Sequence, residues 1–362
     1  MTNALYIHIP FCKHICAYCD FDRCGYNEKL ATQYIYSLEK ELNTIKNKRY
    51  KTIYIGGGTP NALSDSLLYK LLQMVEPFAK DIKEYTIELN VEELNASKLN
   101  IIKESSINRV SLGVQTLDDN ILKIIERKHT IKEVLKAIKD IRNIGIDNIS
   151  IDLIYGLPKQ TLEKWKQDLE EVVKWDIKHI SIYSLTIEEH SKFGREHREL
   201  IDNELEGQYY EKGIEILEKN GFKQYEVANF AKEEKESIHN KVYWEYEDFE
   251  GVGCGASGKV KNERYYNEFK INEYIKGIYI KEVTKLSKEE IKFEAIMMNL
   301  RLRKGINIKE YNKKYECDIL KDNEKAIKEL SNKDWIKVEE DYIKTSNEGQ
   351  MLLHEVLMYF MK

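Results

Sequence analysis

The sequence predicts an α/β protein built on a partial, open (β/α)6 barrel and completed by a C-terminal α+β module. Six short runs rich in β-branched residues alternate with helical stretches in the first half of the chain. That alternation is typical of a parallel sheet, and six units are too few for a closed eight-stranded barrel. The rhythm changes after about residue 200, where the smaller module is expected.

The first half contains the repeated units. Ser64 precedes a helical stretch as an N-cap would, and Gly145 follows another as a C′ residue would. The predicted strands cover residues 5–11, 52–55, 85–91, 109–115, 148–154 and 179–185. The predicted helices cover residues 27–47, 64–78, 96–104, 117–127, 131–144 and 162–173.

The second half predicts a connecting segment and a terminal module. The expected domains are residues 1–200, 201–285 and 286–362. The last resembles a winged helix, but it lacks a concentrated basic face, so a structural or substrate-covering role is favoured over DNA binding. The pattern predicts a helix at 204–220, an edge strand at 225–230, a turn-rich stretch over 239–258, helices at 288–303, 308–314 and 319–330, a hairpin at 335–345 and a helix at 346–360.

Composition excludes several classes of function. Acidic residues number 62 against 57 basic ones, a net charge of −5, which argues against nucleic acid as a partner. No apolar run reaches the ~18 residues that span a bilayer, and the first residues do not resemble a secretion signal. Six cysteines, three of them clustered, favour a reducing cytoplasm.

Three cysteines stand close together near the start of the chain. Cys12, Cys16 and Cys19 form the pattern C-x-x-x-C-x-x-C. A [4Fe–4S] cluster normally takes four protein ligands, so three thiolates would leave one iron open for a ligand that is not protein. A zinc site completed by His14 is the alternative, although zinc motifs usually come as two separated pairs.

Polar residues follow the predicted strands. A loop of three glycines, Gly56–Gly58, comes after the second strand and would present bare N–H groups to a ligand, or would simply form a tight turn. One glutamine, one arginine and one aspartate near strand ends suit a zwitterionic sulfonium ligand, although each could be an ordinary surface residue or a helix cap. A glutamate inside the third strand run would need a partner if it faced the barrel lumen, or it is a charge exposed on one strand face. These residues are Glu88, Gln115, Arg127 and Asp152.

Taken together, the motifs at 6–12, 16–21, 56–60, 113–115 and 152–161 resemble the oxygen-independent coproporphyrinogen III oxidase family of radical S-adenosylmethionine (SAM) proteins. Over essentially the whole chain, the resemblance is strongest to the haem chaperone (HemW) branch. It implies a radical SAM partial barrel with a [4Fe–4S] cluster on Cys12, Cys16 and Cys19. It also implies a SAM site lined by Tyr6, Gly57, Gly58, Thr59, Glu88, Gln115, Arg127 and Asp152, with Tyr18 nearby.

The resemblance implies a chaperone that carries haem as cargo to an acceptor haem protein. His239, in the motif at 239–244, is a candidate for the haem region, or it satisfies a turn. An electron donor such as flavodoxin or ferredoxin is an expected partner, as is peripheral membrane association through a membrane-bound acceptor.

The alternative function is a coproporphyrinogen III oxidase that acts through a 5′-deoxyadenosyl radical. The oxidase branch has a further cysteine where this chain has Phe21, and Cys24 stands three residues later still. Whether the chain is an enzyme therefore stays open, as do the roles of Cys24 and Cys254. A zinc-bound winged-helix regulator is the third hypothesis.

Overall fold

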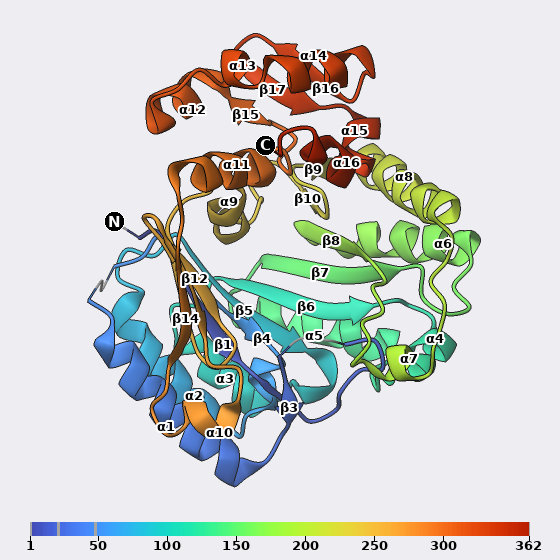
Figure 1. Ribbon diagram of the computed structural model, residues 1–362. Coiled ribbons are helices and arrows are strands. Elements are labelled where there is room, and N and C mark those ends of the chain that lie inside the picture. The colour runs from blue at the N-terminus through green and yellow to red at the C-terminus, as the bar shows by residue number, and fades with distance from the viewer. Residues whose placement is uncertain (1, 20–21, 47–48, 362) are drawn as a thin grey trace.

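The computed structural model describes residues 2–19, 22–46 and 49–361. One twelve-stranded sheet dominates it, in the order β14-β13-β12-β11-β1-β4-β5-β6-β7-β8-β10-β9. The six strands from β1 through β8 along this order are parallel, and β11 adds a further parallel strand beside β1. The sheet curves without closing, so the predicted α/β class and open (β/α)6 barrel are confirmed (Figure 1).

The strands of the large sheet are β1 (Ala4–Ile9), β4 (Thr52–Gly57), β5 (Glu84–Asn90), β6 (Arg109–Gln115), β7 (Asn148–Tyr155), β8 (His179–Ser184), β9 (Lys223–Gln224), β10 (Asn229–Ala231), β11 (Phe249–Val252), β12 (Ser257–Val260), β13 (Glu263–Asn267) and β14 (Ile280–Lys285). A separate short pair is formed by β2 (Phe11–Cys12) and β3 (Cys24–Gly25).

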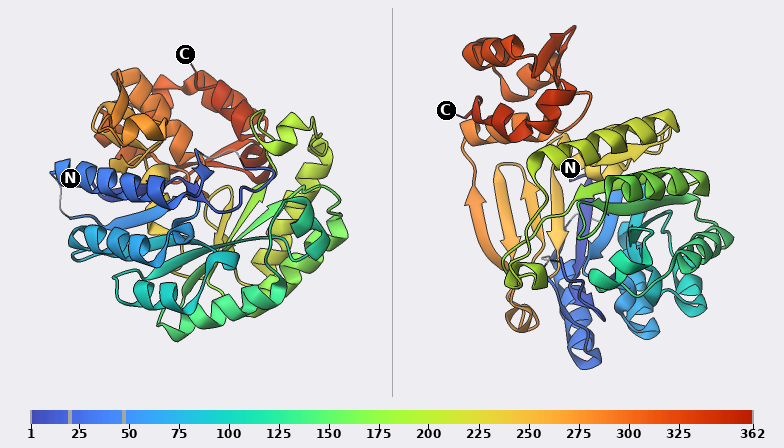
Figure 2. Two further views of the ribbon diagram at one scale, coloured as in Figure 1. Left: turned by 90° about the horizontal axis from the view of Figure 1, so that it is seen from below. Right: turned by 90° about the vertical axis from the view of Figure 1, so that its right-hand side faces the viewer.

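The helices of this part are α1 (Glu28–Thr44), α2 (Asp65–Val75), α3 (Ala96–Lys103), α4 (Asp119–Ile124), α5 (Ile131–Asn143), α6 (Leu162–Val172), α7 (Lys192–Arg195), α8 (Asn203–Lys219), α9 (Ile238–Trp244) and α10 (Ile271–Tyr274). The 3-10 turns are η1 (Pro60–Ala62), η2 (Glu76–Phe78), η3 (Val91–Glu93) and η4 (Val173–Trp175). The main helices lie in an arc on the convex side of the sheet (Figure 2, left).

Alternating side chains of the parallel strands face the two sides of the sheet. One set is apolar and packs under the helices, as Ile53 and Ile55 of β4 do in the main core. The other set faces the concave side and is unusually polar. On β6 it includes the fully buried Arg109 and the buried Ser111. The concave side therefore offers polar groups wherever a ligand can enter.

The C-terminal module has its own core around Leu300, Ile306, Leu330 and Ile343. It packs against one end of the large sheet, at the top of Figure 1. Its elements are α11 (Lys288–Asn299), β15 (Ile306–Asn307), α12 (Ile308–Tyr315), α13 (Ile319–Asp322), α14 (Glu324–Asn332), β16 (Ile336–Glu339), β17 (Tyr342–Thr345), α15 (Asn347–Met351) and α16 (Leu353–Met358), with a three-stranded sheet in the order β15-β17-β16.

The connecting segment differs from its prediction in two places. The edge strand expected at 225–230 is instead the two short strands β9 and β10, with residues 225–228 between them. The stretch expected to be turns contains helix α9 and strands β11 and β12. Glu84 of β5 accepts hydrogen bonds from the backbone N–H groups of Ile238 and His239, which fixes the start of α9. This support comes from a distant strand, in addition to a local N-cap, because the Ser237 hydroxyl accepts a hydrogen bond from the Asn240 N–H at 3.2 Å.

None of the helices in the described ranges has the length and apolar character that crossing a membrane requires.

Candidate functional site

A cavity of about 520 Å³ lies at the carboxyl ends of the parallel strands. Parallel α/β folds commonly bind ligands at this end, because the loops that follow the strands converge there. The resemblance assigned twelve residues to the cluster and to the SAM site. Eleven of them line the cavity: Cys12, Cys16, Tyr18, Cys19, Gly57, Gly58, Thr59, Glu88, Gln115, Arg127 and Asp152.

The loop that bears the cysteines is fixed by backbone hydrogen bonds. The Ala17 N–H donates to the carbonyl of Ile125 at 3.1 Å, and the Phe193 N–H donates to the carbonyl of Ala17 at 2.9 Å. Ala17 is also buried in a small apolar cluster with Ile125 and Phe193. The loop is thus held between the end of α4 and α7, with Cys12, Cys16 and Cys19 on the cavity wall.

The three thiols fit a [4Fe–4S] cluster with one open iron. Such a cluster binds each thiolate through a different iron, so the three sulfurs need not converge on one point. Within the described ranges, no three His, Cys, Asp or Glu side chains converge on a site for a single metal ion. His14, the expected fourth zinc ligand, lines the cavity with its Nε2 3.0 Å from Nζ of Lys128. Burial raises the pKa of the Cys12 thiol to about 11.

The glycine loop is shaped by close approaches. Gly57 has a φ of +109°, and a Cβ there would lie 2.4 Å from the His8 ring. A Cβ on Gly58 would lie 2.8 Å from the carbonyl oxygen of Phe11. The expectation that this loop offers bare N–H groups is wrong for two of its glycines. Gly57 N–H donates to Glu88 Oε2 at 3.0 Å, and Gly58 N–H donates to the carbonyl of Ile9 at 2.8 Å.

Glu88 is the central acid of the cavity. Besides the Gly57 N–H, its carboxylate accepts a hydrogen bond from the Tyr54 hydroxyl at 2.6 Å. Burial raises the pKa of Glu88 to about 7, opposed in part by the bond from Tyr54. A cationic group of a ligand would favour the ionised form, so the site is suited to an ammonium or sulfonium.

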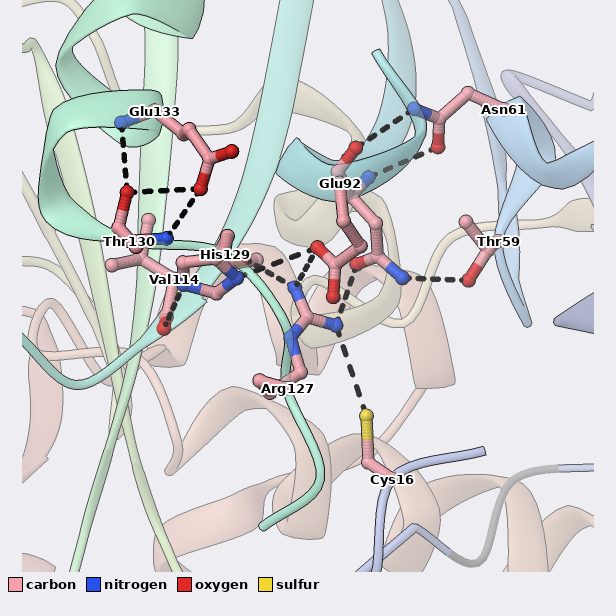
Figure 3. Close-up of polar contacts among 11 residues, drawn as sticks. Cys16, Thr59, Asn61, Glu92, Val114, Arg127, His129, Thr130 and Glu133 are labelled. Atoms are coloured by element: carbon pink, nitrogen blue, oxygen red, sulfur yellow. Dashed lines mark hydrogen bonds and ion pairs between the residues drawn. The ribbon is translucent and has the colours of Figure 1, made fainter. Parts of the chain in front are cut away.

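Arg127 lies between the cysteine loop and the strand ends (Figure 3). Its Nη1 donates to Asn90 Oδ1 at 2.9 Å and lies 3.8 Å from Cys16 Sγ. Its Nη2 donates to the carbonyl of Gly113 at 2.7 Å. Arg127 therefore contacts a cysteine of the loop directly, in addition to lining the cavity.

Glu92 anchors this guanidinium from behind. Its Oε2 lies 3.3 Å from Arg127 Nη2 and 3.4 Å from His129 Nδ1. Burial opposes the ionisation of Glu92, but the adjacent His129 ring and Arg127 charge outweigh it and lower the pKa to about 2. Figure 3 shows Glu92 between the two basic groups, with Cys16 beyond Arg127. Neither Glu92 nor His129 was predicted as a site residue, because the local sequence around Glu92 has no feature that distinguishes it from an exposed surface acid.

Gln115 and Asp152 complete the polar lining. Gln115 has a φ of 71°, in the left-handed region, at an irregularity in the pairing of β6 with β7. Asp152 accepts a hydrogen bond from the Ser111 hydroxyl at 2.8 Å. Burial raises the pKa of Asp152, while the bonds from the neighbouring serines oppose that rise.

Several lining residues were missed by sequence reasoning. Tyr54, Asn90 and Tyr183 are among them, together with residues 184–186 after β8. Tyr54 could have been found from register, because it lies directly opposite Tyr6 in the β1–β4 pair. Tyr6 itself, expected in the SAM site, is not part of the lining; it stacks on Tyr54 with ring centroids 6.2 Å apart.

His239 does not line this cavity but stacks behind Tyr54, which does, with ring centroids 5.2 Å apart. It is 1% exposed, and both ring nitrogens have partners: Nδ1 lies 2.9 Å from Thr52 Oγ1, and Nε2 lies 2.7 Å from the Tyr243 hydroxyl. Burial lowers its pKa to about 3. A haem ligand needs a free nitrogen facing the iron, so this geometry favours the structural interpretation of His239.

The comparison with family models gives two matches. Residues 6–175 match the radical SAM superfamily, and residues 286–352 match the HemN C-terminal domain. The second match covers most of the module that packs on the end of the sheet.

Similar curated proteins extend over the full chain. "Heme chaperone HemW" of Bacillus subtilis is 37% identical, with 99% of each chain covered. The protein of the same name from Lactococcus lactis is 35% identical, covering 99% of this chain and 97% of its own. Among solved structures, the coproporphyrinogen III oxidase HemN of Escherichia coli aligns with a TM-score of 0.87 at 20% identity, covering 99% of this chain and 90% of its own. That structural likeness supports the fold.

Proposed function

Because the chain belongs to the HemW family of radical SAM proteins, we propose that it is a haem chaperone that binds a [4Fe–4S] cluster and SAM and transfers haem to acceptor haem proteins. The central observation is that three cysteines share one cavity with Glu88 and Arg127. The full-length similarity to proteins named haem chaperones supports the cargo.

The chemistry of the cavity supports the two resident groups. We assign the cluster to Cys12, Cys16 and Cys19, whose thiols form one wall of the cavity. Reduced clusters of this kind supply an electron to a bound sulfonium. Glu88 would hold the ammonium of SAM, because it is a buried acid of the lining whose ionised form a cation would favour. Asp152 would serve the ribose hydroxyls as a hydrogen-bond acceptor.

Arg127 and the strand-end amide would hold the carboxylate of SAM. The guanidinium is placed beside Cys16 by Glu92 and Asn90, so a carboxylate bound there would also lie near the cysteine loop. Arginine suits this role because it stays charged and donates in a planar fork. Gln115 can donate a further hydrogen bond from its amide.

The proposed partners follow from this role. They are haem, an acceptor haem protein, and a small electron donor such as flavodoxin or ferredoxin. We place the protein in the cytoplasm, where the thiols of its cysteine cluster would stay reduced, with peripheral contact to a membrane when the acceptor is membrane-bound.

Two anaerobic assays test the proposal against the oxidase alternative. Reconstituted, reduced protein is titrated with haem and, separately, is given coproporphyrinogen III with SAM. The proposal expects stoichiometric haem binding, transfer of that haem to an apo-haem protein, and no turnover of the porphyrinogen. Sustained formation of protoporphyrinogen, or failure to bind haem, would refute it. Phe21, on which the oxidase argument from sequence depends, lies outside the described residues.

A further inference from the structure

A second cavity, of about 510 Å³, lies between the large sheet and the C-terminal module. Asn3, just before β1, lines it, together with Asp248, just before β11, and residues of α11 and α12. The cysteine cavity lies at the carboxyl ends of the parallel strands, so the second cavity is at their opposite ends. None of the residues so far assigned to the cluster or to SAM lines it.

Two lysines from different parts of the chain converge in this cavity. Lys259 Nζ and Lys314 Nζ lie 3.4 Å and 3.1 Å from the same acceptor, the carbonyl oxygen of Tyr246. Each ammonium has three N–H donors. Lys259 uses a second one on Asp248, at 3.0 Å. Donors therefore remain on both ammonium groups, at a point where two positive charges repel each other.

The cavity has more positive than negative charge. Five lysines line it, against three acids. Asp248 is paired with Lys259, whereas among the described residues no carboxylate lies within ion-pair distance of Lys261, Lys288 or Lys314. Partial burial lowers the pKa of the Lys314 ammonium, and the charge of Lys259 lowers it further, while the carboxylates of Glu247, Asp248 and Glu245 oppose that shift. A bound anion would relieve this repulsion. The chain as a whole has a net charge of −5, so this concentration of lysines is local.

Three of the lining residues are apolar or aromatic: Tyr246, Ile291 and Tyr315. Lys259 Nζ lies 4.0 Å from the centroid of the Tyr246 ring, so that ring forms a floor beneath the ammonium. Tyr315 and Ile291, both partly buried, form the side contributed by the module. The cavity thus combines two neighbouring ammonium groups, which suit carboxylates, with an apolar side formed by Tyr315 and Ile291. Its volume lies within the ~300–1,000 Å³ of small-molecule sites.

We propose that this cavity binds the haem cargo, with the propionate carboxylates on Lys259 and Lys314 and one edge of the macrocycle against Tyr315 and Ile291. The inference rests on the proposed function, because haem is the carboxylate-bearing planar molecule that a haem chaperone must hold. It places the cargo at the opposite end of the strands from the SAM cavity. Haem and SAM then bind at the same time without sharing a wall.

The test compares two ligands on two forms of the protein. Haem and its dimethyl ester, which lacks the two negative charges, are titrated into the full chain and into the Lys259→Gln, Lys314→Gln double variant. The Soret band reports binding. Because the variant loses two charge-assisted hydrogen bonds to the carboxylates, haem affinity should fall at least about 10-fold. The affinity for the ester should stay unchanged.

Two further variants guard against a folding artefact. Lys314→Glu changes an exposed side chain and should weaken haem binding more than Lys314→Gln does. Lys309→Gln is the matched control, because Lys309 lies on the same helix and pairs with Asp341 outside the cavity. It should leave haem affinity as in the wild type.

The outcomes separate this inference from the proposed function. If the wild type binds haem and the lysine variants bind it equally well, the cavity is not the haem site, while the chaperone function stands. Equal weakening of haem and of its ester would overturn the assignment of the carboxylates to these lysines. If the wild type binds no haem at all, the proposed function fails, and this inference fails with it.

Discussion

The two cavities have similar volumes, about 520 Å³ and about 510 Å³, but they are built in different ways. In the first, the charged groups are fixed by partners: Arg127 has contacts to Glu92, Asn90 and Gly113. In the second, Lys314 shares one carbonyl with Lys259, and no carboxylate of the described ranges lies at ion-pair distance from it. A fixed set of charges suits a ligand held in one pose. The flexible side chain of the exposed Lys314 would suit a ligand that must also leave, as the proposed haem cargo must.

The strongest test of the first cavity removes one thiol. Cys16→Ala should abolish the [4Fe–4S] cluster, because two thiolates cannot replace three. Iron and acid-labile sulfide per chain, measured after anaerobic reconstitution, should fall to background together with the visible absorption. Cys317→Ser, a change in the C-terminal module, is the control and should keep a full cluster. Retention of iron and sulfide by the Cys16 variant would contradict the assignment.

The fixed character of the first cavity should be visible in stability. The pKa of Glu92 is about 2, below its usual value of 4.5, so its ionised form stabilises the fold above about pH 4.5. That contribution is lost as the pH falls toward 2. The shift corresponds to about 3 kcal/mol, and Glu92→Gln should lower the free energy of unfolding at pH 7 by roughly this amount.

Urea unfolding at several pH values measures this difference. The gap between wild type and Glu92→Gln should shrink as the pH is lowered below 4.5. Glu215→Gln, which changes an exposed acid on α8 paired with Lys212, is the control and should leave the stability nearly unchanged, because solvent screens exposed ion pairs. A Glu92 variant as stable as the wild type at pH 7 would show that the network does not hold Arg127.

Glu88 should behave in the opposite sense. Its pKa is about 7, above the usual 4.5, so its ionisation in the folded chain costs free energy. The cost appears as the pH rises from about 4.5 and is complete above pH 7. Glu88→Gln should therefore stabilise the chain at pH 8, without ligand, by about 1–3 kcal/mol.

The same variant should bind SAM at least about 10-fold more weakly, because it lacks the charge that would pair with an ammonium. Thermal unfolding and equilibrium dialysis give the two numbers. A variant that lost stability and kept its SAM affinity would reverse the role given to Glu88.

The smallest expected effect on ligands concerns His239. Both nitrogens of its ring are hydrogen-bonded inside the protein, so His239→Ala should leave haem affinity and the Soret maximum unchanged. The variant should lose roughly 1–3 kcal/mol of stability, since Thr52 and Tyr243 would each lose a buried partner. A shifted Soret band would instead bring the histidine back as an iron ligand.

The sequence predicted the first cavity well and the second not at all. Cys12, Cys16 and Cys19 stand in one short loop, and Glu88 and Asp152 stand in strand runs, so local pattern brings each of them to the same end of the barrel. Lys259 and Lys314 are 55 positions apart and resemble dozens of solvated lysines. Only the docking of the module on the sheet brings them to one carbonyl.

Two errors of the prediction have the same physical origin. Helix α9 was expected to be turns, yet Glu84 on another strand accepts two backbone hydrogen bonds at its start, which add to the local cap by Ser237. The glycine loop was expected to offer free donors, yet Glu88 and the Ile9 carbonyl take two of them. In both cases a residue distant in sequence takes part in a backbone hydrogen bond. Such a bond cannot be predicted from the neighbouring residues alone.

The backbone hydrogen bonds of Ala17 have a consequence for replacement of a damaged cluster. The cysteine loop is tied to Ile125 and Phe193 by main-chain hydrogen bonds that involve no thiol. Oxygen damage that strips the iron would leave those ties in place, so the loop would keep its shape while empty. We therefore expect the protein that has lost its cluster to accept a new one without first unfolding.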